Sequence, residues 1–282
     1  MISSQMIYPR RTWRLIYHPP SHGSWNMSVD ESILEAASAG KVLPTLRLYA
    51  WNPACLSLGY AQAVSDVDIP RLQARGWEMV RRPTGGRAIL HCDELTYAIA
   101  APTSEPCLTG NLLESYQRIS NALLLALSIL SIPAERSEKP SVKSPSVDQN
   151  PVCFERPSNY EITCHGKKII GSAQARRRDG ILQHGSLPLF GDLSRITQVL
   201  AYPNDLSRMK AGVRLLTRAT TLETILGHPI SWDNAAQAFT AAFQQCLNLD
   251  FEIGELTPSE QIRAMELVKN KYALPSWSER VI

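Results

Sequence analysis

The residues best suited to chemistry in this chain of 282 residues surround a glycine pair, in the run Arg81-Arg82-Pro83-Thr84-Gly85-Gly86-Arg87-Ala88-Ile89-Leu90-His91. Glycine has no Cβ, so Gly85 and Gly86 let backbone N–H groups approach a ligand closely. The neighbouring guanidinium groups suit a carboxylate or a phosphate. The spacing matches neither a dinucleotide fingerprint nor a Walker-type phosphate loop, and such a pair is also common in tight turns. Taken alone, the segment predicts a site for a polar or anionic group.

A second segment, residues 160–176, predicts a β-hairpin. Residues that favour strands lie on both sides of a His165-Gly166 turn. Strand alternation then places Lys167 and Lys168 on opposite faces, so one lysine points inward. We see no obvious acidic neighbour for an inward lysine. Because burying an unpaired charge is costly, a bound ligand would explain it.

The six cysteines are dispersed along the chain. They are Cys55, Cys92, Cys107, Cys153, Cys164 and Cys246. They form no Cys-x-x-Cys pair, and no histidine spacing typical of zinc accompanies them. We therefore expect no metal site and no disulfide framework. This leaves room for a reactive thiol. Separately, we expect no cofactor.

The composition is that of a globular protein, with 44% hydrophobic and 20% charged residues. No apolar run approaches the roughly 18 residues of a membrane span, and the N-terminus lacks the apolar core of a signal peptide. We expect a cytoplasmic protein without a membrane partner. The formal charge of +3 is nearly balanced, and the cluster Arg176-Arg177-Arg178 is too short to indicate nucleic acid, although it could meet an acidic protein.

The hydrophobic pattern predicts helices packed on a sheet. Expected strands are 13–17, 45–49, 55–58, 77–81 and 88–100. We expect the second and third to pair across a Trp51-Asn52-Pro53 turn, and the last two to continue the same sheet. Expected helices are one capped by Ser24 or Asn26 and ending near Gly40, then 112–130, 232–247 and one after Thr257-Pro258-Ser259-Glu260. In the first helix, we expect Asp30 and Glu31 in the early turns, where the positive end of the helix dipole would stabilise their negative charge.

A stretch between Pro133 and Pro151 is rich in Ser, Pro, Lys and Glu. It predicts a mobile surface loop at about 133–151 rather than a strand. The expected domain division is a catalytic domain at 1–255 and a small helical extension at 256–282.

The two segments together resemble the biotin/lipoate protein ligase superfamily. Its lipoate branch carries Arg-Arg-x-x-Gly-Gly-x-x-x-x-His and, later, Lys-Ile-x-Gly-Ser-Ala-Gln, and both patterns occur here in order. Residues 26–31 are similar to the family's first helix and 183–187 to a later strand, so the resemblance covers the chain to roughly Phe251. It implies an α/β (α+β) fold in which a mainly antiparallel sheet is flanked by helices, as in class II synthetases.

Within that superfamily the sequence resembles the cysteine-dependent octanoyltransferase branch. ATP-dependent ligases usually have a third glycine where this chain has Arg87. Residues 84–91, 93–97 and the run beginning Cys153-Phe154-Glu155 match the octanoyltransferase pattern. The resemblance implies transfer of octanoate from octanoyl-acyl carrier protein to a lysine of a lipoyl domain, commonly the glycine-cleavage H protein, as the first step of lipoate biosynthesis.

The same resemblance assigns the site residues. Cys153 would carry the acyl group as a thioester, and Lys168 would favour the thiolate and stabilise the oxyanion. The expected substrate-binding residues are Arg82, Thr84, Gly85, Gly86, His91, Gly171, Ser172, Ala173, His184 and Gly185. Arg82 would bind the carrier's phosphopantetheine or pair with an acidic side chain. His91 and His184 would orient the carbonyl, shuttle a proton or serve only as structural hydrogen-bonding groups.

Three other functions remain open on the sequence. The first is an ATP-using lipoate or biotin ligase, in which Arg82, Gly85, Gly86 and Lys168 surround an acyl-adenylate. The second is a non-catalytic module that binds a carboxylate or an acyl chain. The third is an amidotransferase that passes octanoate between lipoyl domains. ATP dependence and donor preference separate these activities.

Overall fold

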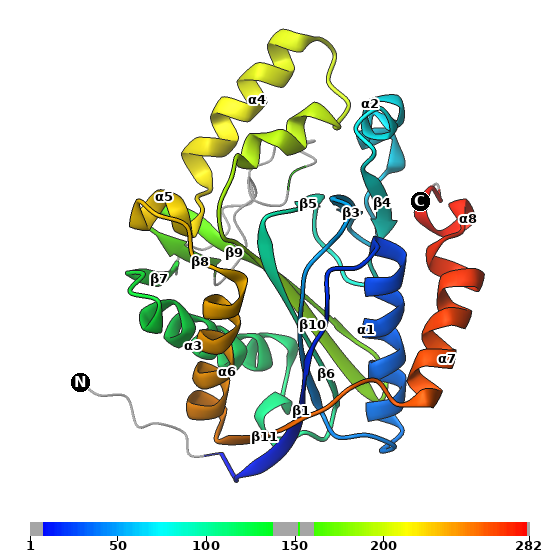
Figure 1. The fold of residues 1–282 in the computed structure, drawn as a ribbon, viewed down its shortest axis with the longest axis vertical. Coiled ribbons are helices and arrows are strands. Elements are labelled where there is room, and N and C mark those ends of the chain that lie inside the picture. The colour runs from blue at the N-terminus through cyan, green and yellow to red at the C-terminus, as the bar shows by residue number, and fades with distance from the viewer. Residues whose placement is uncertain (1–7, 138–151, 153–160, 281–282) are drawn as a thin grey trace.

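The computed structural model describes residues 8–137, 152 and 161–280. Within this part of the chain, one sheet of eight strands lies between helices (Figure 1). In spatial order its strands are β11 (Leu249–Ile253), β1 (Arg11–Tyr17), β2 (Thr45–Tyr49), β6 (Glu94–Pro102), β10 (Gly180–Pro188), β9 (Lys167–Arg176), β8 (Glu161–Cys164) and β7 (Ala134–Ser137). The β1 strand pairs in parallel with β11 and β2, and the other neighbours pair antiparallel. The expected mainly antiparallel sheet flanked by helices is confirmed.

A second, three-stranded sheet lies beside it. Its order is β4 (Glu78–Arg81), β3 (Cys55–Leu58) and β5 (Ile89–His91). The expected pairing of 45–49 with 55–58 is therefore wrong. Both edges of β2 are already occupied by β1 and β6, so β3 has no edge of β2 to join.

The predicted strand at 88–100 is also wrong as a single element. Asp93 has φ of 48° and turns the chain between β5 and β6, which belong to different sheets. The Asp93 carbonyl accepts the N–H of Leu189. This hydrogen bond from a distant segment stabilises the turn. The alternation of residues along the strand does not predict such a contact.

Four longer helices cover the two faces of the large sheet. One face carries α1 (Gly23–Ser38) and α7 (Pro258–Leu267), and the other carries α3 (Leu112–Ile129) and α6 (Trp232–Leu247) (Figure 1). Capping boxes start α3 at Asn111 and α7 at Thr257. The expected helices at 112–130, at 232–247 and after Thr257 are confirmed.

The start of α1 differs from the expectation. Neither Ser24 nor Asn26 caps it, because the helix begins at Gly23. The Gly23 N–H donates to Oε2 of Glu78 at 2.8 Å, so a side chain from β4 satisfies this helix end. Asp30 is not in the first turn, and its carboxylate is used inside the protein, as described below.

The C-terminal helices pack onto α1. Arg14 donates to both carboxylate oxygens of Glu260, which is 1% exposed. Ala264, Leu267 and Tyr272 join the same core cluster as the apolar residues of α1. The division between 255 and 256 stays a prediction. The remaining elements here are a π-helical turn η5 (Val268–Tyr272) and α8 (Pro275–Ser278).

The hairpin predicted at 160–176 is confirmed. Strands β8 and β9 pair antiparallel, and His165 and Gly166 turn the chain with φ of 50° and 73°. The loop predicted at 133–151 is wrong at its start, because β7 occupies 134–137 and pairs with the edge of β8. Residues 138–151 lie outside the described residues.

Other elements complete the fold. They are η1 (Val64–Asp66), α2 (Ile69–Gln73), η2 (Pro106–Leu108), η4 (Leu193–Gln198), α4 (Asp205–Arg218) and α5 (Leu222–Leu226). No helix in the described ranges has the length and apolar character needed to cross a membrane.

Candidate active site

A pocket lies against the α1 face of the large sheet, with about 420 Å³ of space between the atoms, part of it open to solvent. Met27 of α1, Tyr49 of β2 and Trp51 form part of its wall. Most of the predicted substrate-binding residues line it: Arg82, Gly86, His91, Gly171, Ser172, Ala173, His184 and Gly185. The structure therefore brings together residues that are up to about a hundred positions apart in the sequence.

Arg82 stabilises the loop of residues 82–87, called the glycine loop below. Its guanidinium donates to the carbonyls of Gly85 (2.9 Å) and Arg87 (2.8 Å), and to the carbonyl and hydroxyl of Ser57 (3.0 and 3.1 Å). Gly86 has φ of 96°, a conformation that favours glycine. These bonds show Arg82 shaping the loop, a role that neither of the two expectations for this residue included.

Gly59 packs against this loop, a role that the sequence did not predict. A Cβ built on Gly59 would lie 1.9 Å from the carbonyl oxygen of Gly86. The backbone after β3 thus packs directly against the glycine pair, where only a glycine fits. An isolated glycine after a short strand carries no signal of such a contact.

One wall of the pocket contains a directed hydrogen-bond chain from Thr84 through His184 to Asp30. Thr84 Oγ1 lies 2.6 Å from Nε2 of His184, and Nδ1 of His184 lies 3.4 Å from Oδ2 of Asp30. A carboxylate only accepts, so Nδ1 carries the proton and Nε2 accepts from the Thr84 hydroxyl. Burial lowers the pKa of His184, although Asp30 opposes this, so the neutral ring is favoured.

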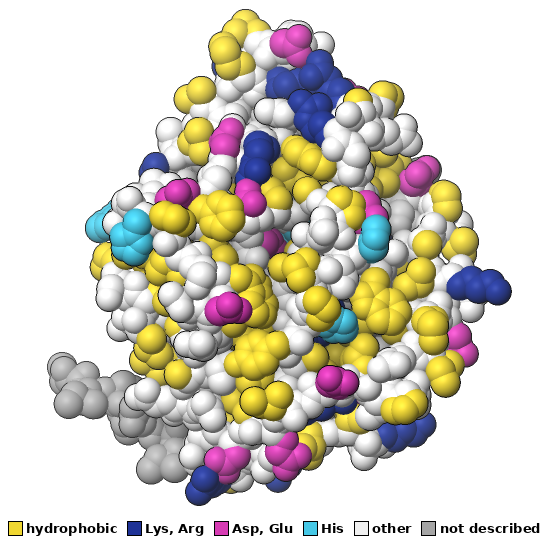
Figure 2. Space-filling view, in the orientation of Figure 1, with side chains coloured by type: hydrophobic (Ala, Val, Ile, Leu, Met, Phe, Trp, Pro, Cys, Tyr) yellow, Lys and Arg dark blue, Asp and Glu magenta, His cyan; other side chains and the backbone are white. Residues whose placement is uncertain are grey.

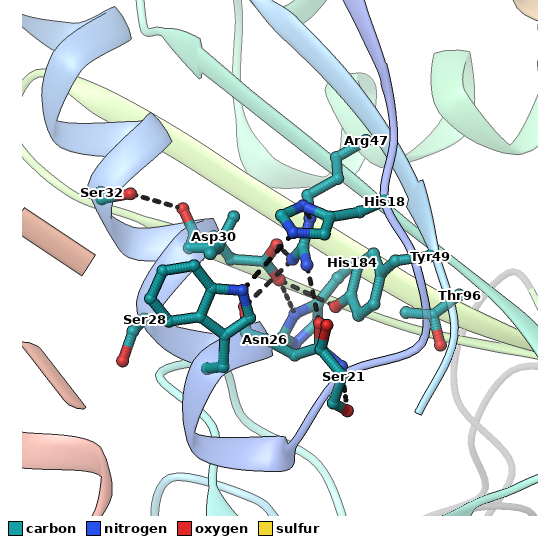
Figure 3. Close-up of polar contacts among 12 residues, drawn as sticks. His18, Ser21, Asn26, Ser28, Asp30, Ser32, Arg47, Tyr49, Thr96 and His184 are labelled. Atoms are coloured by element: carbon teal, nitrogen blue, oxygen red, sulfur yellow. Dashed lines mark hydrogen bonds and ion pairs between the residues drawn. The ribbon is translucent and has the colours of Figure 1, made fainter. Parts of the chain in front are cut away.

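Asp30 is the centre of a buried polar cluster (Figure 3). Its Oδ1 accepts from Arg47 at 2.7 Å, and its Oδ2 accepts from the Tyr49 hydroxyl at 2.9 Å. Arg47 also donates to the carbonyl and side-chain oxygens of Asn26. Burial would raise the pKa of Asp30, but Arg47 and the bond from His184 outweigh it and hold this pKa below its ordinary value. Asp30 therefore stays ionised.

The sequence reading missed the role of Asp30. The sequence predicts that its charge interacts with the positive end of the helix dipole, whereas the side chain points into the protein beside the pocket (Figure 3). Asn26 and Asp30 are four residues apart on α1, so they share one helix face. This spacing, together with an arginine and a tyrosine alternating on β2, was the available signal.

A second hydrogen-bond chain connects Ser57, His91 and Glu94, and its first two members line the pocket. His91 Nε2 lies 2.7 Å from Ser57 Oγ, and its Nδ1 lies 2.7 Å from Glu94 Oε1. Glu94 also accepts from Thr96 and Ser186, and the His91 ring stacks on Trp51 with centroids 4.1 Å apart. His91 is thus held in position within the pocket wall.

Three adjacent strands close the pocket at Gly185. Its neighbours in register are Tyr97 on β6 and Ser172 on β9. The Tyr97 hydroxyl reaches across the glycine to Ser172 Oγ at 2.7 Å. A Cβ on Gly185 would lie 2.5 Å from the Tyr97 ring, so the missing side chain makes this bridge possible.

The alternation predicted one inward lysine; it is Lys168, which is buried, whereas Lys167 is the more exposed of the two. The expectation that Lys168 lacks an acidic neighbour is wrong. Its Nζ lies 2.7 Å from Oε1 of Glu161, which reaches it from β8 of the same hairpin. Lys168 is not among the residues that line the pocket.

Cys153 lies outside the described residues. Its neighbour Val152 is 1% exposed and forms a parallel bridge with Ala88, the residue two positions after Gly86. Val152 also lines a second pocket, of about 450 Å³, which shares Ile89 with the first.

The other cysteines are poor nucleophiles in this fold. Burial raises the pKa of Cys55, Cys107, Cys164 and Cys246, and it raises that of Cys92 to about 12. Their thiols therefore stay protonated near neutral pH. Among the residues that the structure describes, no group of three or more His, Cys, Asp or Glu side chains could hold a metal ion.

The glycine loop, the pocket and the β8–β9 hairpin all fall within residues 22–244, and this range matches the family model of the lipoyl protein ligase A/B catalytic domain. The chain belongs to this family. Its relatives include the octanoyltransferase LipM of Kyrpidia tusciae, 40% identical over 96% of this chain and 99% of the relative. The octanoyltransferase LipM of Symbiobacterium thermophilum is 38% identical over 95% and 98%.

Solved structures of lipoyl protein ligases share the fold. The bipartite lipoate protein ligase of Thermoplasma acidophilum superposes with a TM-score of 0.80 at 23% identity, covering 96% of this chain and 98% of that one. A lipoate-protein ligase A bound with ATP gives 0.78 at 24% identity, with coverage of 96% and 100%. The relatives of this chain confirm two expectations. It is an acyltransferase, and its function is that of an octanoyltransferase in lipoate biosynthesis.

Proposed function

We propose that this enzyme moves an octanoyl group from octanoyl-acyl carrier protein to a lysine of a lipoyl domain, such as the glycine-cleavage H protein, in the cytoplasm. The observation that carries the proposal is the bridge between Val152 and Ala88. It joins the residue before Cys153 to the glycine loop of the pocket. The relatives named octanoyltransferase support the acyl group chosen.

The reaction proceeds through a thioester on Cys153. The thiolate attacks the carbonyl carbon of the octanoyl thioester, and the carrier's thiol leaves with a proton. The amine of the acceptor lysine then attacks the new thioester, which forms the amide and returns the cysteine thiol. The first step exchanges one thioester for another and is nearly thermoneutral, and the second converts a thioester into a more stable amide, so neither step needs ATP.

Lys168 stabilises the oxyanion in each step. Its ion pair with Glu161, 2.7 Å from Nζ to Oε1, holds the ammonium in place. A cation near the reacting carbonyl stabilises charge that develops only in the transition state. The substrate-binding residues then divide into loop, strand and histidine groups: Arg82, Thr84, Gly85 and Gly86; Gly171, Ser172, Ala173 and Gly185; and His91 and His184.

Intact-protein mass spectrometry tests this function. Wild type, Cys153→Ala and the matched control Cys246→Ala are each mixed with octanoyl-acyl carrier protein without ATP. Wild type and the control should gain one octanoyl group, roughly 126 Da, that hydroxylamine removes, and Cys153→Ala should gain none. Adding the lipoyl domain should discharge the adduct.

Other outcomes point to other functions. Labelling that requires ATP and free octanoate would identify a ligase that uses an acyl-adenylate. An adduct formed from an octanoylated lipoyl domain but not from the carrier would identify an amidotransferase. Equal labelling of Cys153→Ala would contradict the assignment of the nucleophile.

A further inference from the structure

Helix α4 presents an apolar stripe to solvent. Leu206, Met209, Val213 and Leu216 are 56%, 61%, 63% and 43% exposed. Their spacing of three or four residues places them on one side of the helix. Monomeric proteins rarely expose a contiguous row of large apolar side chains, and such rows mark interaction surfaces.

The inner side of the same helix is firmly attached. Ala211 and Leu215 are 1% exposed, and Arg208 donates to the carbonyls of Thr197 (2.7 Å) and Leu200 (2.8 Å) beside η4. Gly212 packs close to Ser194 of η4. The exposed stripe therefore belongs to an anchored helix and not to a frayed one.

Charge on the two borders of the stripe is unequal. Lys210, Arg214 and Arg218 follow one border at intervals of four residues, and all three are exposed. Asp205, at the N-terminal end, lies on the other border. Figure 2 shows Lys and Arg side chains gathered near the top, in the region of α4 and α2, with hydrophobic groups beside them. A helix that lies on a membrane usually has basic residues along its whole polar face, whereas an apolar ridge with one basic border complements an acidic amphipathic helix of a protein.

The helix also adjoins the candidate site. Immediately after α4, Ala219 forms a bridge with Lys168, and the Thr220 N–H donates to the Lys168 carbonyl at 3.1 Å. On its inner side Leu215 lines the second pocket, which shares Ile89 with the first. A continuous series of contacts thus connects α4 with the pocket that would hold the acyl group.

We propose that the outer face of α4 docks the acidic helix of the acyl carrier protein that delivers the octanoyl group. This rests on the proposed function and adds the surface that selects the donor. Because Leu215 and the second pocket separate α4 from the first pocket, this face suits a carrier with a long flexible arm, whereas the four-carbon stem of an acceptor lysine is short. The basic border would accelerate encounter with the acidic carrier.

The test compares two donors in the first half-reaction, without acceptor. The variant Met209→Ser/Lys210→Glu alters the stripe and its basic border. The control Met265→Ser/Lys269→Glu makes the same changes on the C-terminal helices, where Met265 is 55% exposed. The rate of octanoyl addition to the enzyme is measured with octanoyl-acyl carrier protein and with octanoyl-N-acetylcysteamine, a small thioester without a protein.

With the carrier, the second-order rate constant of the α4 variant should fall about tenfold, and its dependence on salt should weaken. With the small thioester it should stay within about twofold of wild type, because the pocket is untouched. The control should match wild type with both donors.

Several results would overturn the proposal. These are an unchanged rate with the carrier, an equal loss with the small thioester, an equal loss in the control, or a loss that appears only when the acylated enzyme meets the lipoyl domain. A wild-type dimer that the α4 variant dissociates, or binding to anionic vesicles that it abolishes, would assign the face to another occupant. Failure of wild type with both donors would instead refute the proposed function, and the docking role with it.

Discussion

The Nζ of Lys168 lies 2.7 Å from Oε1 of Glu161, and both side chains are largely buried within one hairpin. The neighbouring Lys167 instead donates from the surface to the Leu216 carbonyl. Two consecutive lysines thus have different surroundings. Substituting each in turn would separate the function of the buried lysine from the general effect of removing a lysine here.

Lys168→Ala should slow octanoyl transfer on the order of 10²-fold or more, the scale of one lost oxyanion donor. Lys167→Ala should leave the rate unchanged, because its side chain is outside the site. Single-turnover kinetics on Cys153 would measure both, at a temperature where circular dichroism shows each variant folded. Near-normal transfer by Lys168→Ala would show that the Lys168–Glu161 pair is only structural.

Asp30→Asn should destabilise the fold by about 3–5 kcal/mol at pH 7, since Arg47 would lose its buried anionic partner. The folded-state pKa of Asp30 lies below its unfolded value of about 3.9, so this stabilisation is complete above that pH. It is lost as the pH falls through the lower, folded pKa. The gap between wild type and Asp30→Asn should therefore narrow at acidic pH.

Urea unfolding at pH 7 and below pH 4 would measure this gap. Asp250→Asn is the control, because Asp250 pairs with Arg10 at the surface and should contribute little. A gap that is small at pH 7, or that widens in acid, would contradict the buried ion pair described above.

His184 should be neutral at pH 7, with its proton on Nδ1. Burial lowers the pKa of this ring, although Asp30 opposes the effect. The neutral form therefore stabilises the fold above the unfolded pKa of about 6.5, and this contribution is lost as the pH falls through the folded value. Two-dimensional NMR of ¹⁵N-labelled histidine rings would report the tautomer.

Thr84→Val should change the Nε2 resonance of His184, because it removes the donor 2.6 Å away. Thr217→Val, at an exposed position of α4, should not change it. A protonated His184 ring at pH 7, or a proton on Nε2, would contradict the direction of the Thr84–His184–Asp30 chain.

Gly185→Ala should destabilise the protein by about 1–3 kcal/mol and weaken acyl transfer, because a Cβ there would overlap Tyr97 and Ser172. Gly85→Ala is the matched change in the glycine loop, where a Cβ meets no atom within 4 Å. It should leave stability nearly unchanged. Thermal unfolding and the rate of acyl-enzyme formation would separate the two, and equal stability of both variants would show that the sheet yields at Gly185.

Local patterns in the sequence determined the elements whose signals are themselves local. Alternation around His165 and Gly166 predicted the hairpin and one inward lysine, and the Thr257–Glu260 capping signal predicted α7. The two glycine-bearing motifs predicted six residues of the pocket lining, because each brings several nearby residues to one place.

The tertiary structure alone decided which residues meet. Glu161 reaches Lys168 through the register and bulge of the hairpin, Asp30 meets Arg47 and His184 from separate elements, and β3 leaves the large sheet because β2 has no unoccupied edge. Periodicity reports that a side chain is buried, but it does not report its partner. Partners depend on how strands far apart in the chain align, and that alignment is set by the packing of the whole fold.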